Sequence, residues 1–262
     1  MQHKSMNWVG VVVGFCVWCG WGMALADEVS VAVAANFSVP VQKIVPLFEH
    51  ETGHKVLVTT GSTGQFYAQI KAGAPFQILL AADEATPLKL EQEGLAVAGT
   101  RFSYARGQLV LWSPKTGRVD AQGEVLKTQV GGDGVKLGKQ DKLAVADAKL
   151  APYGEAAMQV LKRLDLLSVW QGQLVTGSNI GQAYQFVATQ NAALGFVALS
   201  QVWRDGHLTE GSIWRVPPAL YDPLKQDAVL LNPGKGQSAA QSFLAYLRSE
   251  KALQIMRGFG YE

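Results

Sequence analysis

Short apolar runs alternate with longer segments of helical periodicity along the whole chain, and this alternation predicts the fold class. The first part is expected to contain a strand ending at Ala34, a helix at 39–52, a strand at 55–59, a helix at 65–72, a strand at 76–82 and a helix at 83–95. Strands that alternate with helices form a doubly wound, mainly parallel sheet, whose ligands bind at the carboxyl ends of its strands.

A second round of the same pattern follows. Its expected elements are a strand at 108–112, a polar glycine-rich stretch at 116–140, a strand at 143–146, a helix at 152–164, a strand at 174–176, a helix at 179–189 and a strand at 194–199. A final strand at 227–231 and helix at 238–257 are expected to return to the first half. The sequence therefore predicts an α/β protein with two lobes and a cleft between them. The first lobe is expected to comprise residues 27–107 and 223–262, and the second lobe residues 108–222.

Each lobe has two corners at which a strand runs directly into the start of a helix. Ser38 is expected to cap the first of these helices, with Pro40 in its first turn. Helix starts present free backbone N–H groups and the positive end of the helix dipole, so together they favour an anion site. The alternative is that polar residues at these corners only cap helices. The corners are Ala35-Asn36, Gly61-Ser62-Thr63-Gly64, Pro152-Tyr153-Gly154 and Ser178-Asn179-Ile180.

The N-terminal 26 residues have the pattern of a secretory signal peptide. Lys4 precedes an apolar run at 9–21, and Ala24-Leu25-Ala26 matches the small-x-small pattern of a cleavage site. The alternative is a membrane anchor, but the run is shorter than the ~18 residues that span a bilayer. Cleavage after Ala26 is therefore expected, with export to the periplasm.

Charge and cysteine content narrow the function classes. Both cysteines, Cys16 and Cys19, lie in the expected leader, so the mature chain has no disulfide or thiolate chemistry. Loss of the leader removes only Lys4 from the 23 basic residues, which leaves 22 against 21 acidic ones. This balance does not favour nucleic-acid binding. His50, His54 and His207 are scattered and expected in solvent, without a metal-binding motif.

Enzymatic motifs are also missing around the polar corners. The sequence GSTG at 61–64 differs from the G-x-S-x-G nucleophile elbow and lacks the lysine of a nucleotide phosphate loop. No histidine lies near a serine motif, so hydrolysis is not favoured. Binding rather than catalysis is the expected activity.

Four segments resemble the periplasmic molybdate-binding proteins of ABC importers: VAVAANF, GSTGQFYAQIKAGAPFQILLAADE, LAVADAKLAPYGEAAMQVL and NIGQAYQFVATQNAALGFVALSQV. The resemblance covers essentially the whole mature chain. It implies a two-lobed, type II-like periplasmic-binding-protein fold that holds molybdate or tungstate between the lobes without counter-charges. It also implies a monomer that delivers the oxyanion to a permease in the inner membrane.

The resemblance further implies a set of ligand-binding residues without any cofactor or direct cation ligand. It places them at Ala35, Asn36, Ser62, Thr63, Tyr153 and Ile180, with Tyr153 and Ile180 acting through their backbone amides. The competing interpretation of Asn36, Ser62 and Thr63 is helix capping. Ala198 departs from the family pattern, because many members have a tyrosine hydroxyl donor there.

Two other functions remain as alternatives. One is a receptor for another tetrahedral oxyanion such as sulfate. The other is a secreted α/β enzyme that acts on a phosphorylated or sulfated substrate.

Overall fold

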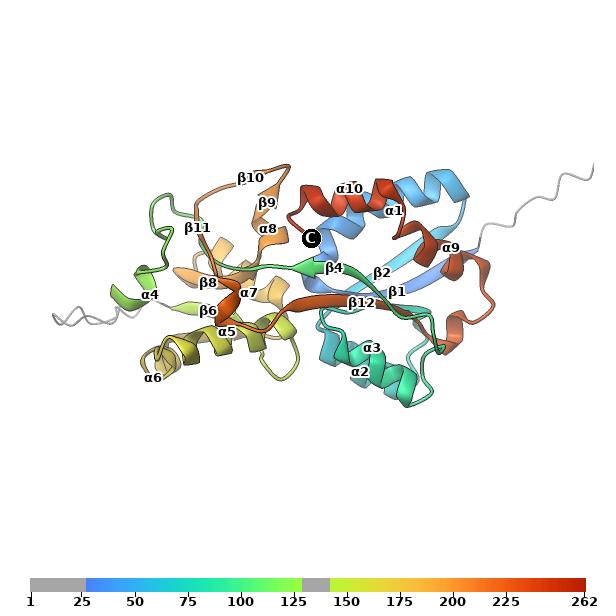
Figure 1. The fold of residues 1–262 in the computed structure, drawn as a ribbon, viewed down its shortest axis with the longest axis horizontal. Helices are drawn as coiled ribbons and strands as arrows, with labels where there is room; N and C mark the ends of the chain where they lie inside the picture. The colour runs from blue at the N-terminus through green and yellow to red at the C-terminus, as the bar shows by residue number, and fades with distance from the viewer. Residues whose placement is uncertain (1–26, 129–141) are drawn as a thin grey trace, which may run out of the picture.

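A computed structural model describes residues 27–128 and 142–262. Two α/β lobes lie side by side along the long axis of the molecule, each built around its own five-stranded sheet (Figure 1). The expected leader at 1–26 and part of the polar glycine-rich stretch lie outside the described residues. The predicted two-lobed α/β fold class is confirmed, but each sheet is mixed rather than mainly parallel, because β12 (Leu224–Leu230) and β5 (Leu109–Ser113) pair antiparallel with both of their neighbours.

The first lobe contains a mixed sheet in the order β2-β1-β3-β12-β4. Strand β1 pairs in parallel with β2 and β3, whereas β12 is antiparallel to β3 and β4. The strands are β1 (Glu28–Ala34), β2 (Lys55–Gly61), β3 (Ile78–Leu80), β4 (Phe102–Gly107) and β12 (Leu224–Leu230). The helices are α1 (Ser38–Thr52), α2 (Thr63–Lys71), α3 (Ala85–Gln92), α9 (Ser238–Tyr246) and α10 (Glu250–Gly258), with the 3-10 turns η1 (Ala35–Phe37) and η4 (Asn232–Gly234).

The second lobe repeats this architecture with the order β11-β5-β8-β6-β7. Strand β6 is parallel to β7 and β8, while β5 is antiparallel to β8 and β11. The strands are β5 (Leu109–Ser113), β6 (Leu143–Ala146), β7 (Leu174–Gly177), β8 (Leu194–Ala198) and β11 (Ser212–Arg215), beside a small hairpin of β9 (Trp203–Arg204) and β10 (His207–Leu208). The helices are α4 (Val125–Thr128), α5 (Pro152–Arg163), α6 (Leu167–Trp170), α7 (Ile180–Ala188) and α8 (Leu199–Val202), with η2 (Gln171–Gln173) and η3 (Pro218–Leu220).

The chain crosses between the two sheets twice. It leaves the first sheet at the end of β4 and enters the second with β5, and it returns along the segment between β11 and β12. Each lobe has an aromatic core: Phe48 packs edge-on against Phe243 in the first, and Trp112 stacks on Tyr184 in the second, at ring distances of 5.1 Å in both cases. Two short crossings between separately packed lobes are suited to a hinge.

Several details of the sequence prediction were wrong. Ser38 is the first residue of α1 rather than its cap, because η1 leads directly into the helix. The C-terminal segment forms two helices instead of one, since Ser249 caps a new helix by accepting a hydrogen bond from Ala252. His54 is buried instead of solvated, with its ring stacked on Phe48.

The described residues contain no helix that is both long enough and apolar enough to cross a membrane.

Candidate functional site

A small cavity lies between the lobes, at the carboxyl ends of strands from both sheets. Its volume is about 10 Å³, which is about the space that one water-sized group needs. All six residues predicted from the sequence line it. The lining consists of Ala34, Ala35, Asn36, Gly61, Ser62, Thr63, Ala82, Ala151, Pro152, Tyr153, Asn179 and Ile180. A space of this size favours a small inorganic solute over an organic one.

The first corner brings Ala35 and Asn36 to the cavity, because β1 ends at Ala34 and η1 turns the chain at once. Asn36 does not cap α1: its Nδ2 donates instead to Gln226 Oε1 and Tyr261 Oη, both at 2.9 Å. The helix-capping interpretation of Asn36 is therefore wrong.

At the second corner, two adjacent residues have different roles. Ser62 caps α2, with its hydroxyl accepting from Gln65 N and its own N–H donating to Gln65 Oε1. Thr63 begins the helix and is 1% exposed, and its Oγ1 accepts from Ala82 N at 2.9 Å. That bond leaves the hydroxyl hydrogen of Thr63 available to the cavity. The N–H of Thr63 has no acceptor within its own helix because it lies in the first turn.

The third corner is the start of α5, where Pro152 occupies the first helical position and Tyr153 follows it. The N–H of Tyr153 lies in the first turn and so has no acceptor within the helix. Its ring is fully buried, and its hydroxyl accepts from Gln226 Nε2, a residue of β12 in the first lobe, at 3.1 Å. Tyr153 therefore contacts the cavity and connects the two lobes.

Gly154 permits the tight fit of this corner against β6. A Cβ at this position would overlap the carbonyl oxygen of Ala146 and lie 2.7 Å from its carbonyl carbon. Replacing Gly154 by Ala is expected to lower the free energy of unfolding by about 1–3 kcal/mol, because backbone atoms must shift to make room. Urea unfolding measures this loss. The control Gly172→Ala, which has no atom within 4 Å of the added Cβ, is expected to leave stability nearly unchanged, and equal stability of the two variants would refute the argument.

The fourth corner is the start of α7. Asn179 caps the helix by accepting from Gln182 N at 3.0 Å, and Ile180 is its first residue, with its N–H directed away from any intrahelical acceptor. Gln201 supports this corner, since its Nε2 donates to Ile180 O and its Oε1 accepts from Ala198 N. Ala198 is buried and is absent from the cavity lining.

The electrostatics of the cavity come from helix starts rather than from charged side chains. None of the lining residues carries a charge. Helices α2, α5 and α7, of 9, 12 and 9 residues, begin at the cavity, as does η1, which continues into the 15-residue α1. Each contributes partial positive charge and free N–H donors. The arrangement is suited to a small anion bound by neutral donors.

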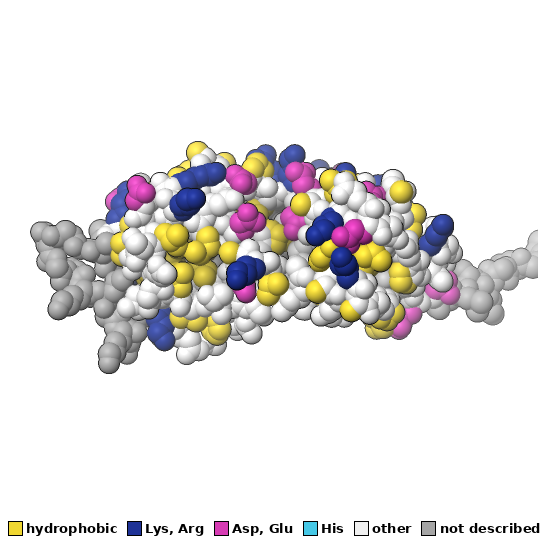
Figure 2. Space-filling view, turned by 90° about the horizontal axis from the view of Figure 1, so that it is seen from below, with side chains coloured by type: hydrophobic (Ala, Val, Ile, Leu, Met, Phe, Trp, Pro, Cys, Tyr) yellow, Lys and Arg dark blue, Asp and Glu magenta, His cyan; other side chains and the backbone are white. Residues whose placement is uncertain are grey.

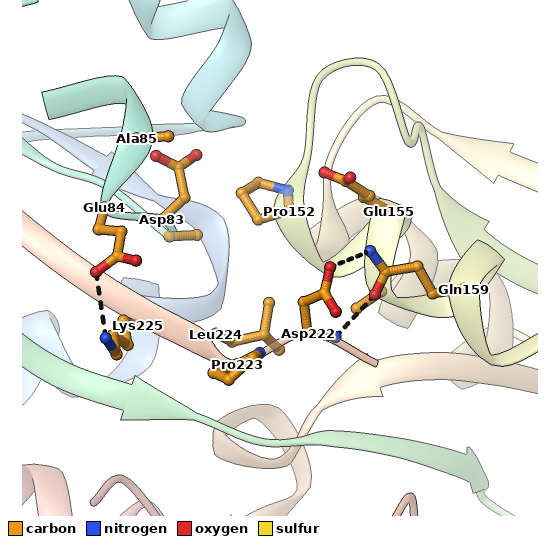
Figure 3. A pocket seen from close by; sticks show the side chains of 12 residues that line it. Asp83, Glu84, Ala85, Pro152, Glu155, Gln159, Asp222, Pro223, Leu224 and Lys225 are labelled. Carbon is orange, nitrogen blue, oxygen red and sulfur yellow. Dashed lines mark hydrogen bonds and ion pairs between the residues drawn. The ribbon is translucent and has the colours of Figure 1, made fainter. Parts of the chain in front are cut away.

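Acidic side chains surround a second pocket at the rim, between α3, α5 and the segment leading to β12 (Figure 3). Asp83 and Glu155 line it, while Glu84 pairs with Lys225 at 3.6 Å. Burial raises the pKa of Asp83 above its ordinary value. Hydrogen bonds from Thr86 lower this pKa, but the effect of burial is larger. The carboxylates of this rim do not attract anions, so it adds nothing to the anion chemistry of the neutral cavity.

The described residues contain no group of three or more His, Cys, Asp or Glu side chains suited to holding a metal ion. On the face seen from below, basic and acidic side chains are interspersed along the middle of the molecule (Figure 2). This face therefore offers no extended basic patch of the kind that nucleic acids require.

Sequence reasoning missed a buried polar network behind the cavity. Ser200 Oγ donates to Asn36 O at 2.7 Å, and Tyr261 lies 3.0 Å from the same oxygen. Gln226 and Tyr104 complete the network, at 3.1 Å from each other. The available signal was Gln226 itself, a polar residue two positions before the apolar run at 228–231.

The lobes are in direct contact at the mouth of the cavity. Gly64 N in α2 donates to Leu150 O of the second lobe at 2.8 Å. A Cβ on Gly181 in α7 would lie 3.5 Å from the Cβ of Ala35 in the first lobe, an ordinary van der Waals contact. The structure thus represents the closed arrangement of the two lobes.

Two α/β lobes that close over a small polar cavity define a solute-binding protein of the periplasmic type. The sequence profile of the family described as "Bacterial extracellular solute-binding protein" matches residues 29–262, and the chain belongs to this family of binding proteins, which are not enzymes. It is 54% identical over 238 residues to the molybdate-binding protein ModA of Azotobacter vinelandii, covering 91% of each chain.

Two further comparisons agree with this relationship. The molybdate-binding protein ModA of Rhodobacter capsulatus is 48% identical over 239 residues, which cover 91% of this chain and 89% of the relative. The solved structure of a periplasmic molybdate-binding protein from Azotobacter vinelandii superposes with a TM-score of 0.83 at 38% identity, covering 90% of this chain and 99% of that one. The resemblance inferred from the sequence is confirmed.

Proposed function

We propose that this protein captures molybdate and tungstate in the cavity between its lobes and delivers them to an ABC permease of the inner membrane. The observation that carries the proposal is the convergence of Ala35, Asn36, Ser62, Thr63, Tyr153 and Ile180 on one uncharged cavity at four helix starts. The names of the relatives at 54% and 48% identity support the choice of oxyanion.

The proposed binding mode uses donors that are fixed before the ligand arrives. The N–H groups of Tyr153 and Ile180 are held by their helices, and the hydroxyl of Thr63 is held by its bond from Ala82 N. Fixed dipoles stabilise a dianion without the ordering of flexible charged side chains. Ala35 contributes its backbone N–H, and Ser62 its hydroxyl hydrogen, since its N–H is already bonded to Gln65.

Closure of the lobes converts binding into a signal for the permease. The lobes are proposed to consist of residues 27–107 with 223–262, and of residues 108–222. The ligand contacts donors from both lobes, so it favours the closed arrangement to the extent that it binds that arrangement more tightly. A permease that recognises the closed protein would then distinguish loaded from empty monomers.

Calorimetric titration of the purified, ligand-free protein with molybdate tests this function. One molybdate per chain is expected, with tungstate competing for the same site. Absence of molybdate binding combined with tight sulfate binding would move the protein to the sulfate receptors. Turnover of a phosphate or sulfate ester would instead support a secreted enzyme.

We also propose that residues 1–26 are a signal peptide and that the mature protein is periplasmic. The pattern Ala24-Leu25-Ala26 and the membership of an extracellular solute-binding family support this location. The intact mass of protein from the periplasmic fraction is expected to correspond to a chain that begins at Asp27. A periplasmic chain that retains Met1 to Ala26 would contradict this prediction.

Affinity for a ligand that stays dianionic is expected to be nearly flat between about pH 6 and 9, because neutral groups line the cavity. Burial raises the pKa of Tyr104 and Tyr153 well above the ordinary value and that of Tyr261 to about 12, so these hydroxyls stay protonated. Calorimetry across this range makes the measurement. A break near the pKa of histidine would contradict the charge-free site.

The variant Asp83→Asn serves as the control for this pH profile. The folded-state pKa of Asp83 is raised, so its carboxylate takes up a proton at a higher pH than an ordinary aspartate does. Protonation removes negative charge close to Ala82 of the cavity, and this is expected to raise anion affinity on the acid side of the flat range. The rise should be absent in Asp83→Asn.

A further inference from the structure

Gln226 lies at the centre of the buried network behind the anion cavity. It belongs to β12 and is 0% exposed. Its Oε1 accepts from Asn36 Nδ2 at 2.9 Å and lies 3.1 Å from the hydroxyl of Tyr104, while its Nε2 donates to the hydroxyl of Tyr153 at 3.1 Å. Both ends of the Gln226 amide are therefore engaged, and its orientation is coupled to that of Asn36.

Asn36 is oriented unfavourably for an anion in this arrangement. Its two Nδ2 hydrogens are directed to Gln226 Oε1 and Tyr261 Oη. Its Oδ1 is the one buried side-chain nitrogen or oxygen within the described residues that has no hydrogen-bond partner. Asn36 lines the cavity, and in this orientation the free group of its amide is an acceptor, whereas an oxyanion requires a donor. Leaving a buried acceptor unpaired is also costly, at about 1–3 kcal/mol.

A concerted inversion of two amides removes this conflict. The oxygen and nitrogen of a side-chain amide are nearly equal in size, so the surrounding hydrogen bonds decide their orientation. If Asn36 turns by about 180°, its Oδ1 takes the place of Nδ2. If Gln226 turns likewise, its Nε2 donates to Asn36 Oδ1 and to Tyr104.

The hydroxyl groups of the network adapt to this inversion, because each one can donate or accept. Tyr153 then donates to Gln226 Oε1, and Tyr261 donates to Asn36 Oδ1. Ser200 continues to donate to Asn36 O. The contacts between the two amides and their partners are kept with reversed direction, while Tyr261 gives up its hydrogen bond to Asn36 O. The Nδ2 of Asn36 is then no longer engaged by Gln226 and Tyr261.

We propose that Gln226 is a positioning residue that fixes the amide of Asn36, and that binding of a tetrahedral oxyanion inverts both amides together. The inference rests on the proposed function of the cavity. Gln226 acts through Asn36 and does not touch the ligand. Its Nε2 also donates to the hydroxyl of Tyr153 at the start of α5, whereas the N–H of Tyr153 is held by the helix itself.

A double-mutant cycle measured by calorimetry with molybdate tests the positioning role. Asn36→Ala is expected to weaken binding about ten- to a hundred-fold and Gln226→Leu about ten-fold. The double variant is expected to bind within about three-fold of Asn36→Ala, because Gln226 has no effect once Asn36 is gone. Gln77→Leu, which removes a part-buried hydrogen bond from Ser30 N to Gln77 Oε1 outside the cavity lining, is the control and should keep wild-type affinity.

If the loss of molybdate affinity in the double variant equals the product of the two single losses, the proposal is overturned. That result would show that Gln226 acts independently of Asn36. A Gln226→Leu variant that keeps wild-type affinity would overturn it as well. Failure of the wild-type protein to bind molybdate is a different result: it would overturn the proposed function, and this inference with it.

Nuclear Overhauser effects in the wild-type protein test the inversion even if the variants do not fold. Without ligand, the Asn36 Nδ2 hydrogens should be close to the ring of Tyr261, a contact within the first lobe. With saturating molybdate, the Asn36 contact should be lost, and the Gln226 hydrogens should move to the ring of Tyr104. An unchanged pattern with molybdate bound would overturn the inversion while leaving the proposed function intact.

Discussion

Sulfate and phosphate are expected to bind at least about a hundred-fold more weakly than molybdate, and tungstate about as well as molybdate. Molybdate, tungstate and sulfate are tetrahedral dianions, so charge does not distinguish them. Molybdate and tungstate are nearly equal in size and larger than sulfate. Only the spacing of the donors can therefore select between them.

The structural reason for this selectivity is the rigidity of the four corners. The N–H groups of Tyr153 and Ile180 belong to helix starts that follow two different strands of the second sheet, β6 and β7, and Thr63 is tied to Ala82. Such donors cannot all move inward around a smaller ion, and each buried donor left unpaired costs about 1–3 kcal/mol. Two donors left unpaired are enough to weaken binding about a hundred-fold.

Competition titration makes the measurement, with millimolar sulfate against micromolar molybdate. Sulfate is expected to leave the molybdate titration almost unchanged. Displacement of molybdate by stoichiometric sulfate would contradict the rigid cage and place the protein among sulfate receptors.

Thr63→Val is expected to weaken molybdate binding about ten- to a hundred-fold. Valine keeps the β-branched shape and removes the hydroxyl, and with it the proposed hydrogen bond to the anion, at about 1.5–3 kcal/mol for a charged partner. The change also leaves the N–H of Ala82 without its acceptor, which is expected to lower the free energy of unfolding by about 1–3 kcal/mol.

Affinity and stability separate these two effects of Thr63. The free-energy cost of the unpaired Ala82 N–H is the same with and without ligand, so it has little effect on the binding affinity. It does lower the stability that thermal unfolding measures. Thr63→Ser keeps the hydroxyl and is expected to restore most of the affinity. Thr60→Val, at an exposed position on β2, is the matched control and should change neither quantity. A Thr63→Val protein with lower stability and wild-type affinity would show that Thr63 is only structural.

The positions of three of the four corners were predictable from local signals in the sequence, whereas the cap expected at Ser38 was wrong. Helix starts were signalled by Pro152, by the Ser62 capping box and by the Asn179 cap, each set by residues within four positions. The apolar strand at 143–146 was predicted with its observed bounds, since its four residues are buried on both faces. Local chemistry of this kind is present in the chain before it folds.

Strands whose pairing depends on distant segments were missed or misplaced. β4 and β11 carry mixed patterns, and they are strands because they pair antiparallel with β12 and β5. The two helices at the C-terminus were predicted as one, because the apolar periodicity continues across the break at Ser249. Antiparallel partners more than a hundred residues away leave no local signature.

The sequence by itself determined which residues begin helices and which of them can donate to an anion. Only the tertiary structure decided how those donors are oriented. Asn36 was identified as a donor, yet its amide is set by Gln226 and Tyr261, which lie 190 and 225 residues away along the chain. Such contacts exist only after β1 and β12 have joined one sheet and the C-terminal segment has packed on it, because the partners of a buried amide are chosen by packing and not by neighbours in sequence.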